Sequence, residues 1–129
     1  MKICHVCAVD FTLNQFLLPL IDQMTKEGWD VSTICSNGSY CHNLRQKGYS
    51  IINVEIPRNL NIYKIIKAII LMYKQFKKSQ FDVVHTHTPV ASVIARIAAK
   101  LAKTPIIIYT AHGFYFHENM NFFKYYFFL

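Results

Sequence analysis

Three of the six histidines stand where apolar stretches of the chain end. His85 is the last residue of the stretch 81–85, and His87 lies two residues further on. His112 comes after the stretch 106–109 and directly precedes Gly113. Side chains two residues apart on a strand point to the same side, so His85 and His87 should share a face. Imidazole can donate hydrogen bonds to phosphate or sugar oxygens and can transfer protons near neutral pH. Because Gly113 would let a ligand approach the backbone, these residues predict a binding or catalytic edge.

The same histidines allow a second hypothesis, a metal-dependent hydrolase. Two histidines separated by one residue on a strand can chelate zinc, and His112 would supply a third ligand to His85 and His87. No further ligand stands out beyond Asp10 and His117, so we expect no metal and no cofactor.

Glycine-rich dinucleotide and P-loop motifs are absent from the sequence, as is the serine elbow of the α/β-hydrolases.

The elements that position these residues alternate between strands and helices. The hydrophobic pattern predicts strands at residues 3–9, 31–35, 49–56, 81–85 and 106–109, and helices at 17–26, 39–47, 61–78 and 91–103. This alternation predicts an α/β fold, a Rossmann-like parallel sheet with helices on both faces. Such sheets bind ligands outside the carboxyl ends of their strands. Besides the histidines, those ends carry Thr12, Asn14 and Arg58.

Several finer features follow from the same pattern. Pro19 should open or kink the helix 17–26. Ser39 should cap the helix 39–47, and Asn61 should cap the helix 61–78. In the helix 91–103, apolar residues are expected to face inward; they are Val93, Ile94, Ile97, Ala98 and Leu101. The aromatic tail 122–129 is expected to begin another helix.

The four cysteines are expected to be reduced and buried. Cys4 and Cys7 form a C-x-x-C pattern, but it lies within a predicted strand. Side chains three apart on a strand point to opposite faces, which argues against a shared metal or a redox dithiol.

Composition bounds the possible partners. The chain has 129 residues, 53% of them hydrophobic, and a formal net charge of +7, as expected for one folded basic domain. No leader sequence and no membrane-spanning run is evident. The lysines of the helix 61–78 form either a solvated face or a surface for anionic lipid. No motif for reading nucleic acid is present, so no nucleic-acid partner is expected.

Two longer strings are more specific. One is Asp82-Val-Val-His85-Thr-His87-Thr-Pro89, and the other is Ile108-Tyr-Thr-Ala-His112-Gly113-Phe114. Together with Pro57-Arg58 and Arg96-Ile-Ala-Ala-Lys100, they make the chain resemble the N-terminal domain of family 4 glycosyltransferases, in the bacterial capsular and exopolysaccharide branch.

The resemblance implies a retaining enzyme of two Rossmann-like domains that face a cleft, the GT-B fold, which needs no metal. Residues 1–129 would be part of the N-terminal, acceptor-side domain, and the C-terminal nucleotide-sugar domain would be absent. The substrates would be a nucleotide sugar, donating a hexose or N-acetylhexosamine, and a polyprenyl-diphosphate-linked acceptor. The enzyme would lie at the cytoplasmic face of the membrane.

The resemblance also assigns residues. It places His112 beside the donor sugar as the catalytic residue, Thr12 and Asn14 near the donor diphosphate, and His85 and His87 on the acceptor side. Arg58 and Gly113 would contribute to substrate binding. As 129 residues alone, the chain is expected to be inactive. A non-catalytic acceptor-binding subunit of a split transferase is the alternative.

Overall fold

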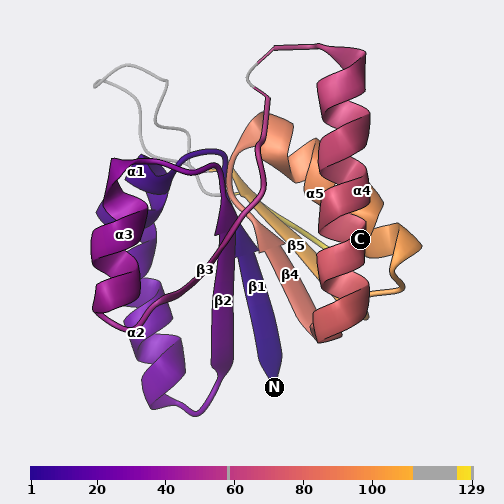
Figure 1. Ribbon diagram of the computed structural model, residues 1–129. Coiled ribbons are helices and arrows are strands. Elements are labelled where there is room, and N and C mark those ends of the chain that lie inside the picture. Colours follow the sequence, from indigo (N-terminus) through magenta and orange to yellow (C-terminus); the bar gives the residue numbers. More distant parts are fainter. Residues whose placement is uncertain (58, 112–124, 129) are drawn as a thin grey trace.

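One six-stranded sheet organises the computed structural model, which describes residues 1–57, 59–111 and 125–128 (Figure 1). The strands are β1 (Lys2–Val6), β2 (Asp30–Cys35), β3 (Ser50–Asn53), β4 (Val83–Thr86), β5 (Ile106–Ala111) and β6 (Tyr125–Phe128). They follow the order β3-β2-β1-β4-β5-β6, in which the first five are parallel. The chain builds outward from β1 to β3 and then returns to the other side of β1. The strand order therefore reverses between β1 and β4, where ligands of such sheets bind.

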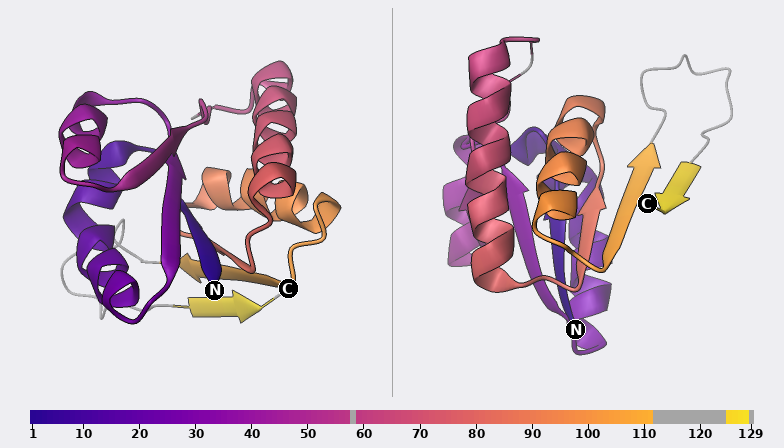
Figure 2. Two further views of the ribbon diagram at one scale, coloured as in Figure 1. Left: turned by 60° about the horizontal axis from the view of Figure 1, so that its bottom comes forward. Right: turned by 90° about the vertical axis from the view of Figure 1, so that its right-hand side faces the viewer.

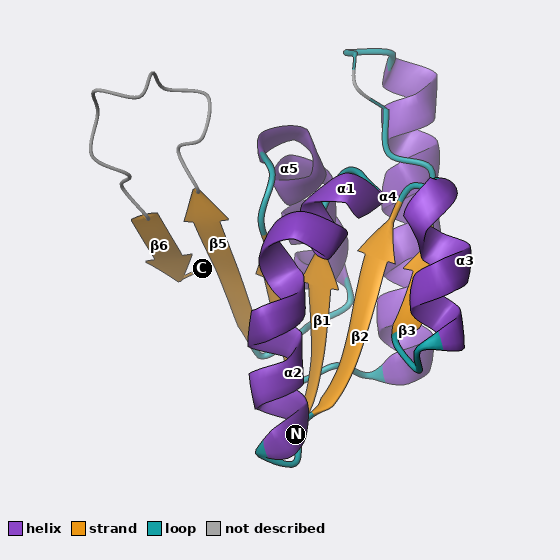
Figure 3. Cartoon of the chain, turned by 90° about the vertical axis from the view of Figure 1, so that its left-hand side faces the viewer, coloured by secondary structure: helices purple, strands orange, loops and turns teal. Residues whose placement is uncertain are grey.

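Helices cover both faces of the sheet, which confirms the predicted Rossmann-like α/β class. On one face lie α1 (Asp10–Thr12), the π-helix η1 (Leu13–Leu17), α2 (Leu18–Lys26) and α3 (Ser39–Gln46), shown in Figure 3. On the other face α4 (Ile62–Ser79) and α5 (Pro89–Leu101) pack against each other (Figure 2).

Local signals in the sequence set several element boundaries. The side chain of Asn61 accepts a hydrogen bond from the backbone of Lys64, so Asn61 caps α4 as predicted. Gly28 follows α2 with a φ of 92°, a backbone conformation that glycine adopts without steric cost. Two strands are clearly shorter than predicted, since β1 ends at Val6 rather than Val9 and β3 spans only Ser50–Asn53, whereas β5 extends two residues further, to Ala111.

The segment after β1 differs from the prediction. Residues 10–15 were expected to be a loop, but a continuous helical run begins at Asp10 and extends through η1 to Lys26. Pro19 lies in the first turn of α2, directly after η1. Proline cannot donate the hydrogen bond of a regular helix, and the wider π-helical turn before it lets the helix continue. Pro19 therefore opens α2, as one of the two alternatives predicted, although the helical run itself begins earlier, at Asp10.

Two separate cores lie on the two faces of the sheet. Cys4 and Val6 belong to the core beneath α4 and α5, whereas Cys7 belongs to the core beneath η1, α2 and α3. Cys4 and Cys7 thus point to opposite faces, as the strand geometry predicted. All four cysteines are free thiols and are buried. Burial raises the pKa of the Cys4 thiol well above its usual range, which keeps it protonated and unreactive.

The predicted inner face of α5 was too wide. Ile94 and Ala98 are buried as expected, but Val93, Ile97 and Leu101 are 54%, 43% and 59% exposed. Helix α4 shows the same pattern, with Ile66 and Ile70 about half exposed. Each helix contacts the sheet and the other helix along only part of its circumference. Its apolar face is wider than this contact, so the apolar side chains at the margin remain exposed.

The aromatic tail was predicted to be helical, and this was wrong for the part that the structure describes. Tyr125–Phe128 forms β6, antiparallel to β5, with Ile108 opposite Phe128. Tyrosine and phenylalanine favour strands, and the outer edge of β5 offers backbone groups for pairing. In the described part of the chain, no helix has both the length and the hydrophobicity needed to cross a membrane.

Candidate functional site

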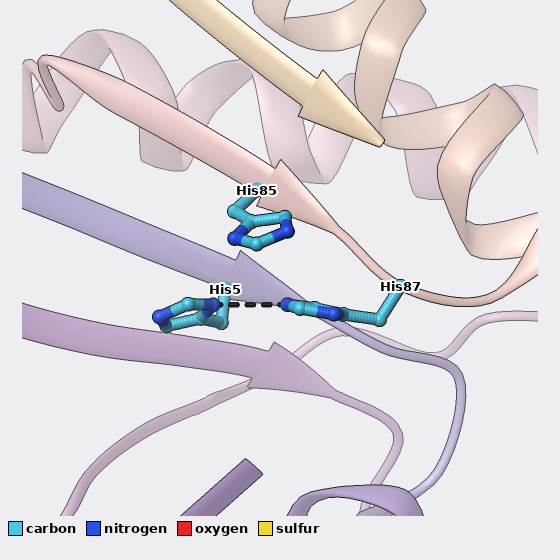
Figure 4. A group of neighbouring side chains, drawn as sticks. All are labelled: His5, His85 and His87. Carbon is cyan, nitrogen blue, oxygen red and sulfur yellow. Dashed lines mark hydrogen bonds between the residues drawn. The ribbon is translucent and has the colours of Figure 1, made fainter. Parts of the chain in front are cut away.

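Three histidine side chains meet at the carboxyl ends of β1 and β4 (Figure 4). His5 on β1 is paired in register with His85 on β4, and His87 follows β4 by one residue. The Nδ1 atom of His5 lies 2.9 Å from Nε2 of His87, and one of the two donates a hydrogen bond to the other. The rings of His85 and His87 are 4.1 Å apart between centroids. The prediction that these two histidines share a face is therefore confirmed.

Burial makes the three imidazoles unequal. His5 and His87 are buried, whereas His85 is half-buried. Removal from water, followed by the neighbouring charge of His85, lowers the pKa of His5 to about 3. His5 is therefore neutral at physiological pH. Its Nε2 atom is buried and has no hydrogen-bond partner among the described residues.

Hydrogen bonds hold the surrounding loops in place. His85 Nε2 lies 2.6 Å from the hydroxyl of Thr110 on β5, which orients the imidazole. The Thr88 hydroxyl accepts a hydrogen bond from the backbone N–H of Ala8 at 3.1 Å, and the backbone N–H of His87 donates to Val6. The segments that follow β1 and β4 are thereby tied together on either side of the point where strand order reverses.

The other predicted site residues differ in burial, and three of them lie outside the described part of the chain. Thr12 ends α1 and is buried at 6% exposure, whereas Asn14 lies half-buried in η1. Both follow β1 at the carboxyl edge of the sheet, but the structure gives Thr12 little surface to offer a ligand. Arg58, His112 and Gly113 lie outside the described residues.

A polar pocket of about 260 Å³ opens near the carboxyl ends of β2 and β3. Its lining residues are Val9, Ser36, Asn37, Glu55, Ile56, Pro57, Asn59 and Lys64. The Ser36 hydroxyl accepts a hydrogen bond from the backbone of Ile56, which fixes one wall. The amide, carboxylate and ammonium groups among these residues can bind the hydroxyl groups of a sugar.

The side chain of Asp10 caps a helix at this edge of the sheet. Its carboxylate accepts a hydrogen bond of 2.7 Å from the backbone N–H of Tyr40, in the first turn of α3. Gly38 makes room for it, because a Cβ at that position would overlap both carboxylate oxygens. Ser39 was expected to cap this helix, but the cap comes from Asp10, 30 residues away in sequence.

Sequence reasoning missed His5, which it counted as part of an apolar strand. The histidine expected beside His85 and His87 was His112, which lies outside the described residues. A signal for His5 was present: in a sheet whose order reverses after its first strand, that strand pairs with the fourth. The register of that pair, in which Ile3 lies opposite Val83, then places His5 opposite His85.

The parallel sheet, the reversal of strand order and the helices on both faces define a Rossmann-like domain. Residues 2–128 match the family described as glycosyl transferase 4-like, and the chain belongs to that family.

Curated relatives agree with this assignment. The chain is 31% identical over 121 residues to an Escherichia coli enzyme named UDP-Gal:alpha-D-GlcNAc-diphosphoundecaprenol alpha-1,3-galactosyltransferase, covering 92% of this chain and 31% of that enzyme. It is 34% identical to the putative glycosyltransferase EpsD of Bacillus subtilis, covering 89% and 30%. A third relative, 29% identical, is the capsular polysaccharide biosynthesis glycosyltransferase CapM of Staphylococcus aureus, covering 97% and 32%. The chain spans just under a third of the length of these relatives.

Solved structures share the fold. MurG of Acinetobacter baumannii superposes with a TM-score of 0.69 at 22% identity, covering 88% of this chain and 35% of MurG. A glycosyltransferase of Rickettsia africae gives 0.68 at 18% identity, covering 85% and 28%. The UDP-GlcNAc 2-epimerase of Methanocaldococcus jannaschii gives 0.65 at 18% identity, covering 88% and 31%. At these identities the likeness concerns the fold alone.

Proposed function

We propose that the protein carrying this chain is a retaining glycosyltransferase of surface-polysaccharide synthesis. It transfers a hexose or N-acetylhexosamine from a nucleotide sugar to a polyprenyl-diphosphate-linked acceptor. Residues 1–129 form part of its acceptor-side domain, and a second domain supplies the nucleotide-sugar site. The observation that carries the proposal is membership of the glycosyl transferase 4-like family over residues 2–128. The named substrates of the Escherichia coli relative are of the same two classes.

The described geometry supports an acceptor-side role. His85 and His87 lie at the reversal of strand order, where parallel sheets of this kind bind ligands. The pocket beside β2 and β3 lies at the same edge and offers polar groups for a sugar. His112, which directly follows β5 in the sequence, is the residue that we assign to the reacting centre.

The test uses the full-length protein, a radiolabelled nucleotide sugar and a lipid-linked acceptor. We expect transfer with retention of the donor's anomeric configuration, observable by NMR of the product. His112→Ala should lower kcat by roughly two orders of magnitude, the usual scale for a group that acts in the transition state. His42→Ala, which changes an exposed histidine on α3, is the matched control. Unchanged turnover in His112→Ala would remove His112 from the mechanism, and no transfer with any donor would refute the proposed activity.

We further propose that the protein is cytoplasmic and peripheral, with α4 and α5 against the anionic inner face of the membrane. The exposed side chains on these helices are both apolar and basic. The apolar ones include Ile62, Tyr63, Ile66, Ile70, Val93, Ile97 and Leu101, and the basic ones include Lys64, Lys67, Lys74 and Lys100. Apolar side chains that enter the interface and lysines that meet anionic headgroups act together in such binding.

Vesicle sedimentation tests this orientation. Each lysine near an anionic surface contributes about 1 kcal/mol, so Lys67→Glu with Lys74→Glu should weaken binding to phosphatidylglycerol vesicles by roughly ten-fold or more. Lys26→Glu with Lys47→Glu makes the same charge change at exposed positions on the opposite face. Equal losses in both double variants would show that only net charge matters and would contradict the proposed orientation.

A further inference from the structure

The histidine cluster has the composition of a metal site as well as its position at the ligand-binding edge. His5, His85 and His87 each offer one ring nitrogen, and these three atoms lie within 4.8 Å of one another. Within residues 1–57, 59–111 and 125–128, no other group of three potential ligands comes together in this way. His5 and His85 lie on adjacent strands, and His87 directly follows β4, as Figure 4 shows.

We propose that His5, His85 and His87 bind a divalent transition-metal ion of the zinc class. Three imidazoles suit zinc, cobalt, nickel and copper, and they leave a fourth position for water or an anionic oxygen. With zinc–nitrogen bonds of about 2.0 Å, tetrahedral ligand atoms lie about 3.3 Å apart. His5 Nδ1 and His87 Nε2 are already 2.9 Å apart, and all three ring nitrogens lie within 4.8 Å, so rotation of the side chains would bring them to this spacing around an ion.

A hydrogen bond beside the cluster also favours binding. The Thr110 hydroxyl lies 2.6 Å from Nε2 of His85. When that nitrogen donates to Thr110, Nδ1 holds the lone pair for the metal, an arrangement that commonly orients ligating histidines.

The proposed metal site has a structural consequence that does not depend on sugar transfer. Its ion would join β1 to β4 across the point where strand order reverses. It would also occupy the imidazoles of His85 and His87, which the proposed function places on the acceptor side. Zinc is therefore expected to raise the thermal stability of the protein. Because the measurements below need no sugar donor, their outcome is independent of the proposed transferase activity.

The test is titration of chelator-stripped, full-length protein with Co²⁺ and Zn²⁺ at pH 7.5. We expect one equivalent of Co²⁺ to give the intense visible absorption of a four-coordinate ion, and Zn²⁺ to displace it. His85→Ala and His87→Ala should weaken binding by more than about ten-fold, and Thr110→Val by about ten-fold. His42→Ala should bind like the wild type.

Because His85 is only half-buried, His85→Ala should disturb the fold less than His87→Ala. Circular dichroism of each variant checks that the fold persists. Cobalt spectra of a six-coordinate ion only, or equal affinity in the wild type and the folded His85→Ala and His87→Ala variants, would overturn the proposed site.

Discussion

The contact between Asp10 and Gly38 makes a quantitative prediction about coupling between two distant positions. The carboxylate of Asp10 occupies the space where a Cβ of residue 38 would lie, and it caps α3 through the backbone N–H of Tyr40. Gly38→Ala must displace the carboxylate and break this bond. Loss of a helix cap costs about 1 kcal/mol, and leaving a buried carboxylate unpaired adds about 1–2 kcal/mol. We therefore expect Gly38→Ala to lower the free energy of unfolding by about 2–3 kcal/mol.

The Asp10→Ala background should remove most of that cost. Gly38 has a φ of −158°, an extended conformation that alanine adopts freely. Once the carboxylate is gone, alanine at position 38 should be neutral or stabilise the protein by up to about 0.5–1 kcal/mol, because it restricts the unfolded chain. Asp10→Ala alone should cost about 1–2 kcal/mol through the lost cap. The coupling free energy of the two changes should then exceed about 1 kcal/mol.

Urea unfolding of the wild type, both single variants and the double variant measures this coupling as a double-mutant cycle. The control is Gly28→Ala, whose positive φ makes alanine costly although nothing lies near its Cβ. Its cost should be the same with and without Asp10→Ala. If the costs of Asp10→Ala and Gly38→Ala simply add, the proposed steric contact is wrong.

Three further predictions concern stability and reactivity. The pKa of His5 is about 3 in the folded protein against 6.5 as its ordinary value, so the unfolded state binds more protons between these values. The free energy of unfolding therefore falls as pH drops, by about 2 kcal/mol from pH 7.5 to 5 in chelator-containing buffer. His5 faces His85 and His87, and His5→Asn should flatten this pH dependence in urea unfolding; an unchanged slope would assign it elsewhere. Ile94→Ala should cost about 2–5 kcal/mol, whereas Ile97→Ala, at a 43% exposed position, should change stability by less than about 0.5 kcal/mol; similar costs would contradict the exposed stripe on α5. Finally, the four buried thiols should react with a thiol reagent far more slowly in native protein than in urea, and fast native labelling of all four would show that the cores open readily.

The order of strands and helices along the chain could be predicted from the amino-acid sequence. Short apolar runs alternate with helical periodicity, and Asn61 and Gly28 mark helix ends through their own side-chain and backbone properties. These signals are local, because capping and backbone preference act over a few residues. The pairing of His85 with His87 on one face is local as well, since it depends only on the two-residue repeat of a strand.

Side-chain surroundings were harder to predict. Val93, Ile97 and Leu101 are as apolar as the buried Ile94, yet they lie exposed because α5 contacts the sheet and α4 on only part of its surface. The cap of α3 was assigned to its neighbour Ser39, although a carboxylate 30 residues away in sequence provides it. The aromatic tail was predicted to be helical, but the free edge of β5 pairs with Tyr125–Phe128.

By itself, the sequence determined the α/β class, the two-faced helical cover, the separation of Cys4 from Cys7 and the family resemblance, because each depends on short-range periodicity or on strings of adjacent residues. The tertiary structure alone decided that β1 lies beside β4, which places His5 against His85 and His87, and that Asp10 reaches α3. These contacts join residues 30 to 82 positions apart. No local preference encodes them, since they arise only when the order of strands in the sheet brings the two segments together.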